Sequence, residues 1–487
     1  MTESIIEEPT YMRDVRHFFA DVDLDHMFGL GIDITTYDAL KAESTDVYVH
    51  TLGPNAHMPP EPDRKWTAER SQSFFNWISK GHPLGVPEVQ PLATSAASRI
   101  RKDARDLSAD ELQALRNAFS GVMALEPDDP NSYFTLAGLH WFPVPSECKH
   151  HEDKYNPWHR VFMNRFEDAL RSVPGCETVT LPYWDITGAP PNFLYEPPFD
   201  SYTLPLDVHA LYPAGYATSR FDAATLMENV ASYGIPEDIT TSLAEFRWSR
   251  FTTGIEGAHD EGHVSIGPTM SRPDVAAFDP LFWFFHSNWE RLWWNWQQAM
   301  QATTEWSFRS TIDTSTLFLT PPFNALEPFS QTAEQAINLA AMDVGYAEPQ
   351  GPDKGPVVPE TLEPSTRGSL IASSTMRATR RRVSARVKGV DRLAIPGSFR
   401  VVLRADGEPV GRRAFFQSTQ PKDCENCRQR RRADFDFVVD LEDVSDRSLS
   451  VDVELLSRDD PREGVTVPLR ACGNPTLNVR VLLEEMS

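Results

Sequence analysis

The chain has 487 residues, of which 40% are hydrophobic, and it carries a formal net charge of -24. This length predicts two or three domains, and the negative charge opposes binding to nucleic acid. We find no apolar run long enough to span a membrane, and the acidic start MTESIIEEPTYMRD lacks an apolar secretory segment. Five cysteines are too few for a disulfide scaffold. We therefore expect a soluble, cytoplasmic protein without a nucleic-acid or membrane partner.

The first part of the chain, residues 1–97, scatters glycine, proline and polar residues among aromatics, and predicts an irregular N-terminal extension. The pattern sharpens from residue 98 onward. Ser108 and Glu111 have the spacing of a capping box and precede an apolar helical series. A further helix is expected to carry Tyr133 to His140.

Two later helices share one start signal, a polar cap residue followed by proline. Asn156-Pro157 precedes the periodic stretch WHRVFMNRFEDALR, and Asp279-Pro280 precedes the strongly apolar LFWFFHSNWERLWWNWQQAM. Helical periodicity also returns near Ser242 to Phe251. The sequence thus predicts a helical domain over residues 98–347.

The composition changes after this region. Residues 348–366, which include PQGPDKGPVVPETLEP, are typical of an exposed linker. Alternating runs such as SFRVVLRADG, FDFVVDL and LSVDVELL then predict strands, so residues 367–487 are expected to form a β-sandwich. The arginine clusters RATRRR and RQRRR are interpreted as solvated surface opposite an acidic helical domain.

Histidine spacing is the strongest chemical signal. Imidazole is a good ligand for copper, zinc and iron, and residues four apart on a helix share one face. The sequence HDEGH also invites a zinc-protease interpretation, but that motif needs glutamate directly after the first histidine, where this chain has Asp260. Spacing alone leaves several metal enzymes open, including a dizinc or diiron hydrolase. The candidate ligands form two groups: His140, His150 and His159; then His259, His263 and His286.

Six segments, in this order, resemble the type-3 copper proteins, which include tyrosinases, catechol oxidases and hemocyanins. They are YFTLAGLHWFP, CKHH, NPWHRVFMNRFEDAL, LPYWDIT, IEGAHDEGH and FDPLFWFFHSNWERLWWNWQ. The resemblance covers about residues 99–345. It implies a mainly α catalytic domain, with a four-helix bundle holding two copper ions, dioxygen as co-substrate and small phenols as substrates. The first three histidines would bind one copper, and the last three the other.

The resemblance also implies a covalent feature near the first copper. His150, rather than His151, matches the family ligand that lies nine residues before the histidine of the WHR motif. It follows Cys148 by two residues, as in fungal tyrosinases and molluscan hemocyanins, where this cysteine forms a thioether with the ring. We predict the same bond between Cys148 and His150; the alternative is a plain buried thiol.

Residues around the second group are assigned roles by the same resemblance. Glu256 is expected to hold a water that removes the phenol proton. Asp260 replaces the asparagine frequent in monophenol hydroxylases; it could serve as a base, be protonated, or be held by an arginine. Phe282 is expected in the apolar shell, and Pro273, thirteen residues before His286, would border the entry to the second copper.

The segment FFQSTQPKDCENC resembles the C-terminal domain of fungal tyrosinases and molluscan hemocyanins. It implies that the sandwich covers the copper pocket, with Phe415 as an inserted plug and Phe416 as its neighbour. Cys424 and Cys427 would serve in copper loading, for which soft thiolates suit Cu(I); a local disulfide is the alternative.

Together these features predict a latent, tyrosinase-like oxidoreductase. It would ortho-hydroxylate monophenols and oxidise o-diphenols to o-quinones. Two alternatives lie within the family: a catechol or o-aminophenol oxidase without monophenolase activity, and a hemocyanin-like oxygen-binding protein. A homo-oligomeric state also stays open.

Overall fold

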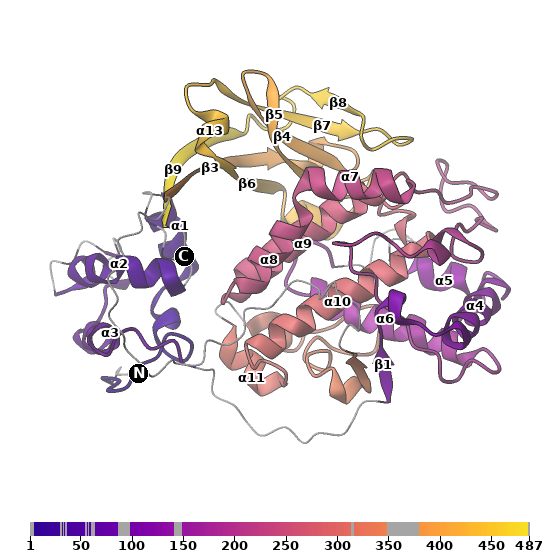
Figure 1. Cartoon of the computed structure of the whole chain (residues 1–487), viewed down its shortest axis with the longest axis horizontal. Coiled ribbons are helices and arrows are strands. Elements are labelled where there is room, and N and C mark those ends of the chain that lie inside the picture. The colour runs from indigo at the N-terminus through magenta and orange to yellow at the C-terminus, as the bar shows by residue number, and fades with distance from the viewer. Residues whose placement is uncertain are drawn as a thin grey trace.

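The computed structural model describes residues 4–29, 32, 34, 37–53, 56, 58–59, 64–85, 98–140, 149–312, 316–347 and 379–485. Figure 1 shows a large helical body, a β-sandwich packed over one side of it, and a smaller group of N-terminal helices beside both. The mainly α domain followed by a β-sandwich agrees with the expected fold class. Within the described residues, we find no helix that is both long and apolar enough to cross a membrane.

The N-terminal part was expected to be irregular, and this is wrong for the described residues, which form short helices. Aromatic packing holds them together: the Phe74 ring centroid lies 5.3 Å from that of Trp66 and 5.5 Å from that of Trp77. Arg247 Nη2 donates a hydrogen bond to the Arg16 carbonyl at 2.9 Å, which ties the group to the helical body. The elements are η1 (Val15–Phe18), α1 (Asp21–Gly29), α2 (Tyr37–Thr51) and α3 (Ala68–Ser79).

The helical body is closed by a short parallel strand pair, in which Arg99 lies opposite Val344. Helix α6 packs against α4 and α10, and α9 packs against α7 and α8. Its elements are β1 (Arg99–Arg101), η3 (Ala104–Asp106), α4 (Ala109–Met123), α5 (Tyr133–Gly138), α6 (Tyr155–Ser172), η4 (Asn192–Tyr195), α7 (Ala223–Tyr233), α8 (Ile235–Ala244), α9 (Trp248–Ile266), η5 (Ala276–Phe278), α10 (Leu281–Ala299), α11 (Glu305–Thr311), η6 (Thr316–Leu319), η7 (Ala340–Met342) and β2 (Val344–Tyr346).

The helix starts follow local chemistry. The capping box of Ser108 and Glu111 is present at the start of α4. Helix α6 begins at Tyr155 with Lys154 as its cap, two residues earlier than the Asn156-Pro157 signal predicts, and Asn156 Nδ2 donates to Thr252 Oγ1 at 3.2 Å. This side chain therefore joins α6 to α9.

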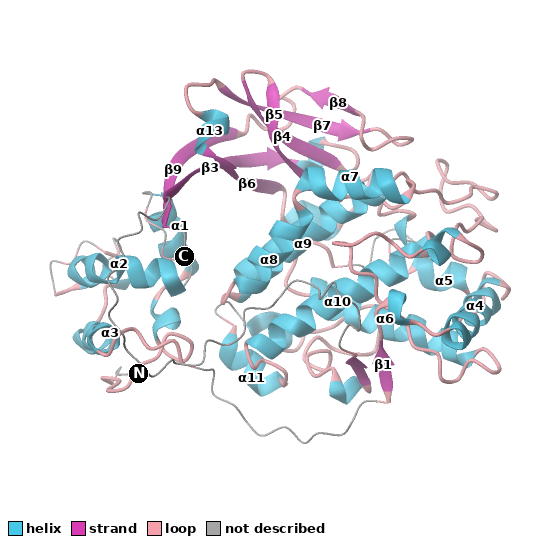
Figure 2. Cartoon of the chain, viewed as in Figure 1, coloured by secondary structure: helices cyan, strands magenta, loops and turns pink. Residues whose placement is uncertain are grey.

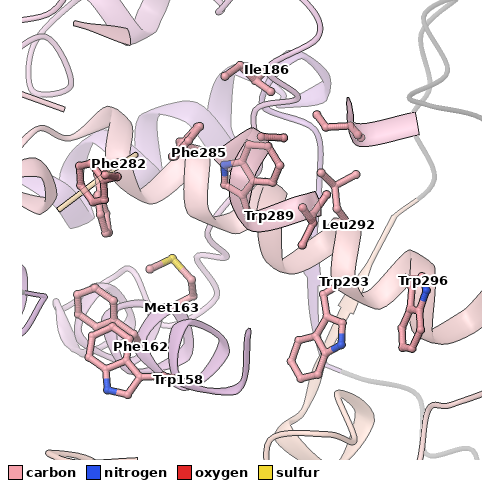
Figure 3. Packing of buried hydrophobic residues seen from close by; sticks show 14 of the residues in the cluster. Trp158, Phe162, Met163, Ile186, Phe282, Phe285, Trp289, Leu292, Trp293 and Trp296 are labelled. Atoms are coloured by element: carbon pink, nitrogen blue, oxygen red, sulfur yellow. The ribbon is translucent and has the colours of Figure 1, made fainter. Parts of the chain in front are cut away.

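Aromatic side chains fill the space between α6 and α10 (Figure 3). The rings of Phe166 and Trp283 stack with centroids 3.5 Å apart, and Phe162 lies 4.9 Å from Trp283. A buried ion pair crosses the same interface, where Arg160 Nε lies 2.5 Å from Glu290 Oε1. Gln297 Oε1 accepts a hydrogen bond from the Arg160 guanidinium at 2.9 Å. These contacts fix the positions of α6 and α10 relative to each other.

The C-terminal domain is a sandwich of two antiparallel sheets (Figure 2). One sheet has the strand order β6-β3-β9 and the other β5-β4-β7-β8. The expected linker 348–366 lies outside the described residues. The elements are β3 (Thr379–Asp391), η8 (Arg392–Ala394), β4 (Phe399–Ala405), β5 (Glu408–Phe415), α12 (Glu425–Gln429), β6 (Arg432–Asp440), α13 (Leu441–Val444), β7 (Leu449–Leu456), β8 (Gly464–Val467) and β9 (Thr476–Glu485).

Candidate metal centre

The six candidate histidines converge inside the helical body, and each is at most 5% exposed. Helix α9 supplies two of them one turn apart, α6 supplies one from its first turns, and α10 supplies one. The two groups adjoin, because the rings of His159 and His286 stack with centroids 5.1 Å apart. His150, in the loop before α6, lies with its ring 5.1 Å from His140 and 5.0 Å from His159.

Backbone carbonyls fix the orientation of four rings. A carbonyl can only accept, so each facing Nδ1 carries the proton and leaves Nε2 with a lone pair. Of the other two rings, those of His150 and His259, His259 has its Nδ1 3.2 Å from Asp260 Oδ1. The carbonyl contacts of Nδ1 are His140 with Pro273 (3.3 Å), His159 with Tyr155 (2.8 Å), His263 with Met270 (2.7 Å) and His286 with Phe282 (3.0 Å).

These lone pairs point at one another. His259 Nε2 lies 3.0 Å from His263 Nε2 and 3.1 Å from His286 Nε2. His159 Nε2 is buried and has no hydrogen-bond partner among the described residues. Burial lowers the pKa of His159 to about 4 and of His263 to about 3, so no second proton relieves the repulsion. A metal cation between the nitrogens would relieve this repulsion, and the donor set fits a metal cation.

Two three-histidine sets meet the spacing of a metal site, with ligand atoms within 4.8 Å of one another. They are His140, His159 and His286, and His259, His263 and His286. His286 thus stands between the two sets, and His150 adjoins the first set without belonging to it at this spacing. Burial lowers the pKa of the remaining four ligand candidates as well, with the neighbouring histidines as further causes. All six imidazoles are therefore neutral and able to bind a metal.

Comparison with known proteins agrees with this geometry. Residues 130–203 and 210–299, which contain all six of the histidines in question, match the family model described as the common central domain of tyrosinase. The chain therefore contains a tyrosinase central domain, which is a domain of the type-3 copper family. The resemblance stated from the six sequence segments is therefore confirmed.

Similar proteins include hemocyanins and a tyrosinase. The chain is 28% identical over 257 residues to Hemocyanin 2 of Megathura crenulata, an alignment that covers 49% of this chain and 7% of that protein. The alignment with Hemocyanin 1 of the same organism covers only 8% of that protein. Tyrosinase HcTyr2 of Hahella sp. (strain CCB-MM4) is 25% identical over 471 residues, covering 64% of this chain and 81% of that protein.

Solved structures support the fold. The tyrosinase from Burkholderia thailandensis at high pH superposes with a TM-score of 0.56 at 21% identity, covering 78% of this chain and all of that one. Recombinant mushroom tyrosinase (abPPO4) gives a TM-score of 0.55 at 17% identity, covering 80% of this chain and 92% of that one.

Two carboxyl groups lie beside the histidines on one face of α9. Glu256 Oε1 accepts a hydrogen bond from the His151 backbone amide at 2.5 Å, and burial raises the pKa of Glu256 to about 8. Burial, and then the charge of Glu256, raise the pKa of Asp260 well above its usual range. Asp260 Oδ2 accepts from the Phe416 backbone amide at 2.9 Å. Asp260 is thus held by the sandwich backbone and not by an arginine.

The expected shell residues have distinct positions. The Phe282 ring stacks on His286 with centroids 3.7 Å apart, as expected for the apolar shell. Pro273 is buried, and its carbonyl orients His140; its role at the entry stays a prediction. Phe285 packs with its centroid 4.9 Å from that of His263. Gly262 permits this approach, because a Cβ there would meet the Phe285 ring at 2.8 Å.

The plug prediction requires a correction. Phe416, not Phe415, enters the metal centre: its ring stacks on His263 with centroids 4.0 Å apart and an interplanar angle of 14°. Phe415 points into the sandwich core, 5.1 Å from Phe399, and also stacks on His151 at 4.1 Å. Side chains alternate along an extended strand, so neighbouring residues face opposite sides.

The remaining assignments concern cysteines and arginines. Cys148 lies outside the described residues, so the thioether stays a prediction. Cys424 and Cys427 flank the start of α12 as free cysteines. From the cluster RQRRR, Arg430 acts electrostatically on Glu152 and Glu256, in line with the expectation that these arginines oppose an acidic surface. Sequence reasoning missed His151 and Arg392 as contacts between the two domains, because His151 was considered only as an alternative to the ligand His150 and Arg392 belongs to no recognisable motif.

Proposed function

We propose that the protein is a copper-dependent phenol oxidase of the tyrosinase type, which oxidises o-diphenols to o-quinones and hydroxylates monophenols. The observation that carries this proposal is the set of neutral imidazoles whose Nε2 atoms face one another at 3.0 and 3.1 Å. Together with the adjoining set of His140, His159 and His286, these imidazoles suit two adjacent cations better than one structural ion. Copper is the metal that the family implies, and dioxygen is the expected co-substrate.

The ligand assignment proposed from the sequence is compatible with the geometry. His140, His150 and His159 would hold one copper, and His259, His263 and His286 the other. Bound copper would supply dioxygen binding and electron transfer to and from the phenol. The carbonyls that face Nδ1 keep each ring in the tautomer that a metal requires, and the ring of Phe282 covers the side of His286 and limits water.

Glu256 is the proposed proton acceptor for monophenols. It is the only one of the two α9 carboxyl groups not held by the sandwich backbone, because Asp260 accepts from the amide of Phe416. A carboxyl group whose pKa lies near the working pH is well suited to proton transfer, and burial brings that of Glu256 to about 8. The His151 amide donates to one of its oxygens, Oε1.

The sandwich is proposed to keep the enzyme latent. The Phe416 ring lies parallel to His263 and 5.4 Å from His150, in the space where a phenol ring would have to lie. It is 1% exposed, so substrate and plug exclude each other. Cleavage in the 348–366 linker, or loosening of the interface, should admit small phenols.

A direct experiment tests this function. The full chain is loaded with copper, its metal content is measured, and o-quinone formation is followed with catechol and with tyrosine before and after limited proteolysis of the linker. We expect two coppers per chain and quinone formation that rises after cleavage. His263→Ala should abolish it, whereas His209→Ala, at a histidine 33% exposed and outside the metal centre, serves as the matched control. Zinc or iron in place of copper, or no quinone from the cleaved protein, would contradict the proposal.

A second candidate is an oxygen carrier. It is favoured by the hemocyanin relatives and by the complete cover of the site by Phe416, since small dioxygen needs less space than a phenol. Reversible oxygen binding by the copper-loaded protein, with no turnover of catechol even after linker cleavage, would support the carrier and reject the oxidase.

A further inference from the structure

A pair of thiols lies in the sandwich at its contact with the metal centre. Cys424 and Cys427 are three residues apart, and the Cys427 backbone amide donates to Cys424 Sγ at 3.2 Å. Cys427 is 1% exposed, whereas Cys424 is partly exposed. The pair thus combines one accessible sulfur with one buried sulfur close behind it, which is the arrangement of an attacking and a resolving cysteine.

A buried arginine connects this pair to the plug. Arg392 Nη2 donates to Cys427 Sγ at 3.2 Å, and Arg392 Nε donates to Gln417 Oε1 at 3.1 Å. Gln417 directly follows Phe416, and its own amide donates to the Ile395 carbonyl at 2.6 Å. Arg392 is 3% exposed, and its guanidinium also lies over the Phe415 ring, 4.6 Å from the centroid. The buried sulfur is therefore one of the few partners that satisfy this cation next to the plug.

One of the two residues between the thiols, Asn426, contacts the loop of a proposed copper ligand. Asn426 Nδ2 donates a hydrogen bond to the backbone carbonyl of His150. This bond crosses from the sandwich to the loop that carries a proposed copper ligand. Any change in the backbone between Cys424 and Cys427 is thus transmitted to the domain contact.

The other described cysteines lack these features. Cys176 Sγ contacts only the Ala114 carbonyl, at 3.7 Å, and Cys472 Sγ contacts carbonyls of its own turn, at 3.4 and 3.7 Å. Burial raises the pKa of both thiols. The hydrogen bond from Cys427, by contrast, is the main cause that lowers the pKa of Cys424 to about 6, which favours the reactive thiolate.

We propose that Cys424 and Cys427 form a reversible thiol–disulfide switch that weakens the hold of the sandwich on the metal centre when it is oxidised. The oxidant is a low-molecular-weight disulfide. The Cys424 thiolate attacks one of its sulfurs, forms a mixed disulfide and releases one thiol. The Cys427 thiol then loses its proton and attacks Cys424 Sγ, which closes the protein disulfide and releases the second thiol. Two electrons pass from the protein thiols to the external disulfide.

Oxidation removes a charged or polarisable acceptor from beside Arg392. A disulfide sulfur accepts hydrogen bonds poorly, so the buried guanidinium loses a partner and its restraint on Gln417 weakens. The closed contact at Phe416 should then open more often. The consequence for activity rests on the proposed oxidase function, whereas the disulfide and the opening do not.

The experiment uses the copper-loaded full chain, incubated with oxidised glutathione or left reduced, with reagents removed before measurement. Trypsin cuts after Lys422 and Arg428, so both thiols lie in one peptide, 423–428. We expect this peptide to lose two hydrogen masses in the oxidised sample. Backbone amides of 413–417 should exchange with deuterium roughly fivefold faster, as expected when one hydrogen bond of ordinary net strength is lost. Catechol oxidation should rise by a similar factor and fall again after reduction.

Matched variants keep the result interpretable. Cys424→Ser and Cys427→Ser should show neither the faster exchange nor the rise in activity, whereas Cys472→Ser, in the same sandwich, should keep both; activity is expressed per bound copper. The switch is rejected if the peptide stays reduced, or if the disulfide forms and exchange at 413–417 does not change. If exchange responds but no catechol is oxidised even after linker cleavage, the oxidase proposal fails and the switch stands.

Discussion

Two adjacent residues belong to different cores of this protein. Phe415 packs in the sandwich with Phe399 and Val453, whereas Phe416 belongs to the large apolar cluster of the helical body. The metal centre is built inside the body by closely packed aromatic rings. The sandwich reaches it with one ring and a set of polar contacts. The difference teaches that the centre can stay assembled while its cover moves.

The polar contacts between the domains are specific. Arg413 Nη1 lies 2.6 Å from Asp238 Oδ2 and 3.2 Å from the buried Glu261 Oε1, on the two helices α8 and α9. Thr419 Oγ1 donates to Asp274 Oδ2 at 2.8 Å. Ion pairs and hydrogen bonds of this kind respond to salt, pH and proteolysis more than apolar packing does. The helical body and the contact between the sandwich and the metal centre should therefore respond differently to a change in salt or pH, or to proteolysis.

The largest effect is expected at the centre of the body. His263→Ala removes an imidazole that faces His259 and the Phe416 ring, so the chain should bind about one copper fewer and lose all quinone formation. Copper analysis and a catechol assay after linker cleavage measure this. Retention of two tightly bound coppers by the variant would show that the proposed ligand set is wrong.

The body should also be sensitive to loss of its buried ion pair. Arg160→Met leaves Glu290 with only Arg101 and Tyr346 as partners, so the free energy of unfolding should fall by about 3 kcal/mol. Denaturant unfolding of the metal-free protein measures the change. Arg309→Met, at an exposed ion pair with Glu305, is the control and should cost less than about 1 kcal/mol. Equal losses in both variants would remove the special role of the buried pair.

Glu256 lies where the helical body and the sandwich meet. Its substitution should affect monophenol hydroxylation and diphenol oxidation to different extents. Glu256→Gln should lower monophenol hydroxylation by about a hundredfold and leave diphenol oxidation nearly unchanged. In the parent protein the hydroxylation rate should rise as pH approaches about 8, the pKa of Glu256, because the carboxylate is the acceptor. A flat profile in the parent, or the same loss with both substrates, would assign Glu256 to structure.

The titration of Glu256 should also change the stability of the fold. A rise in pH should increase the hydroxylation rate but lower this stability. The folded-state pKa of Glu256 is raised above the ordinary 4.5 by burial, so its protonated form favours the folded protein. This stability is fully present below pH 4.5 and is lost as pH rises to about 8. The metal-free Gln variant should lose less stability over this interval than the parent does.

The smallest effect is expected at the cover. Phe416→Ala removes the ring stacked on His263, so the uncleaved protein should oxidise catechol roughly tenfold faster. Phe415→Leu, in the sandwich core, is the control and should not raise the rate. An equal rise in both variants would mean that general loosening, and not the plug, controls access.

Local patterns in the sequence determined much of the helical body. The capping box at Ser108, the i, i+4 pair on α9 and the apolar run of α10 depend on neighbours within a few residues, and the structure contains each of them. The six histidines could be grouped because helical periodicity and family order place them on separate elements. The alternating runs after residue 379 likewise depend only on strand periodicity, and they form the two sheets.

Tertiary structure decided the features that depend on distant contacts. The choice of Phe416 over Phe415 follows from how β5 faces α9, and Asp260 is held by an amide 156 residues away. The N-terminal helices were missed because aromatic contacts such as those of Trp77 stabilise them more than local periodicity does. Burial sets the pKa of Glu256 and the link from Arg392 to Cys427. Sequence spacing encodes which residues share a face, but only packing determines what that face meets.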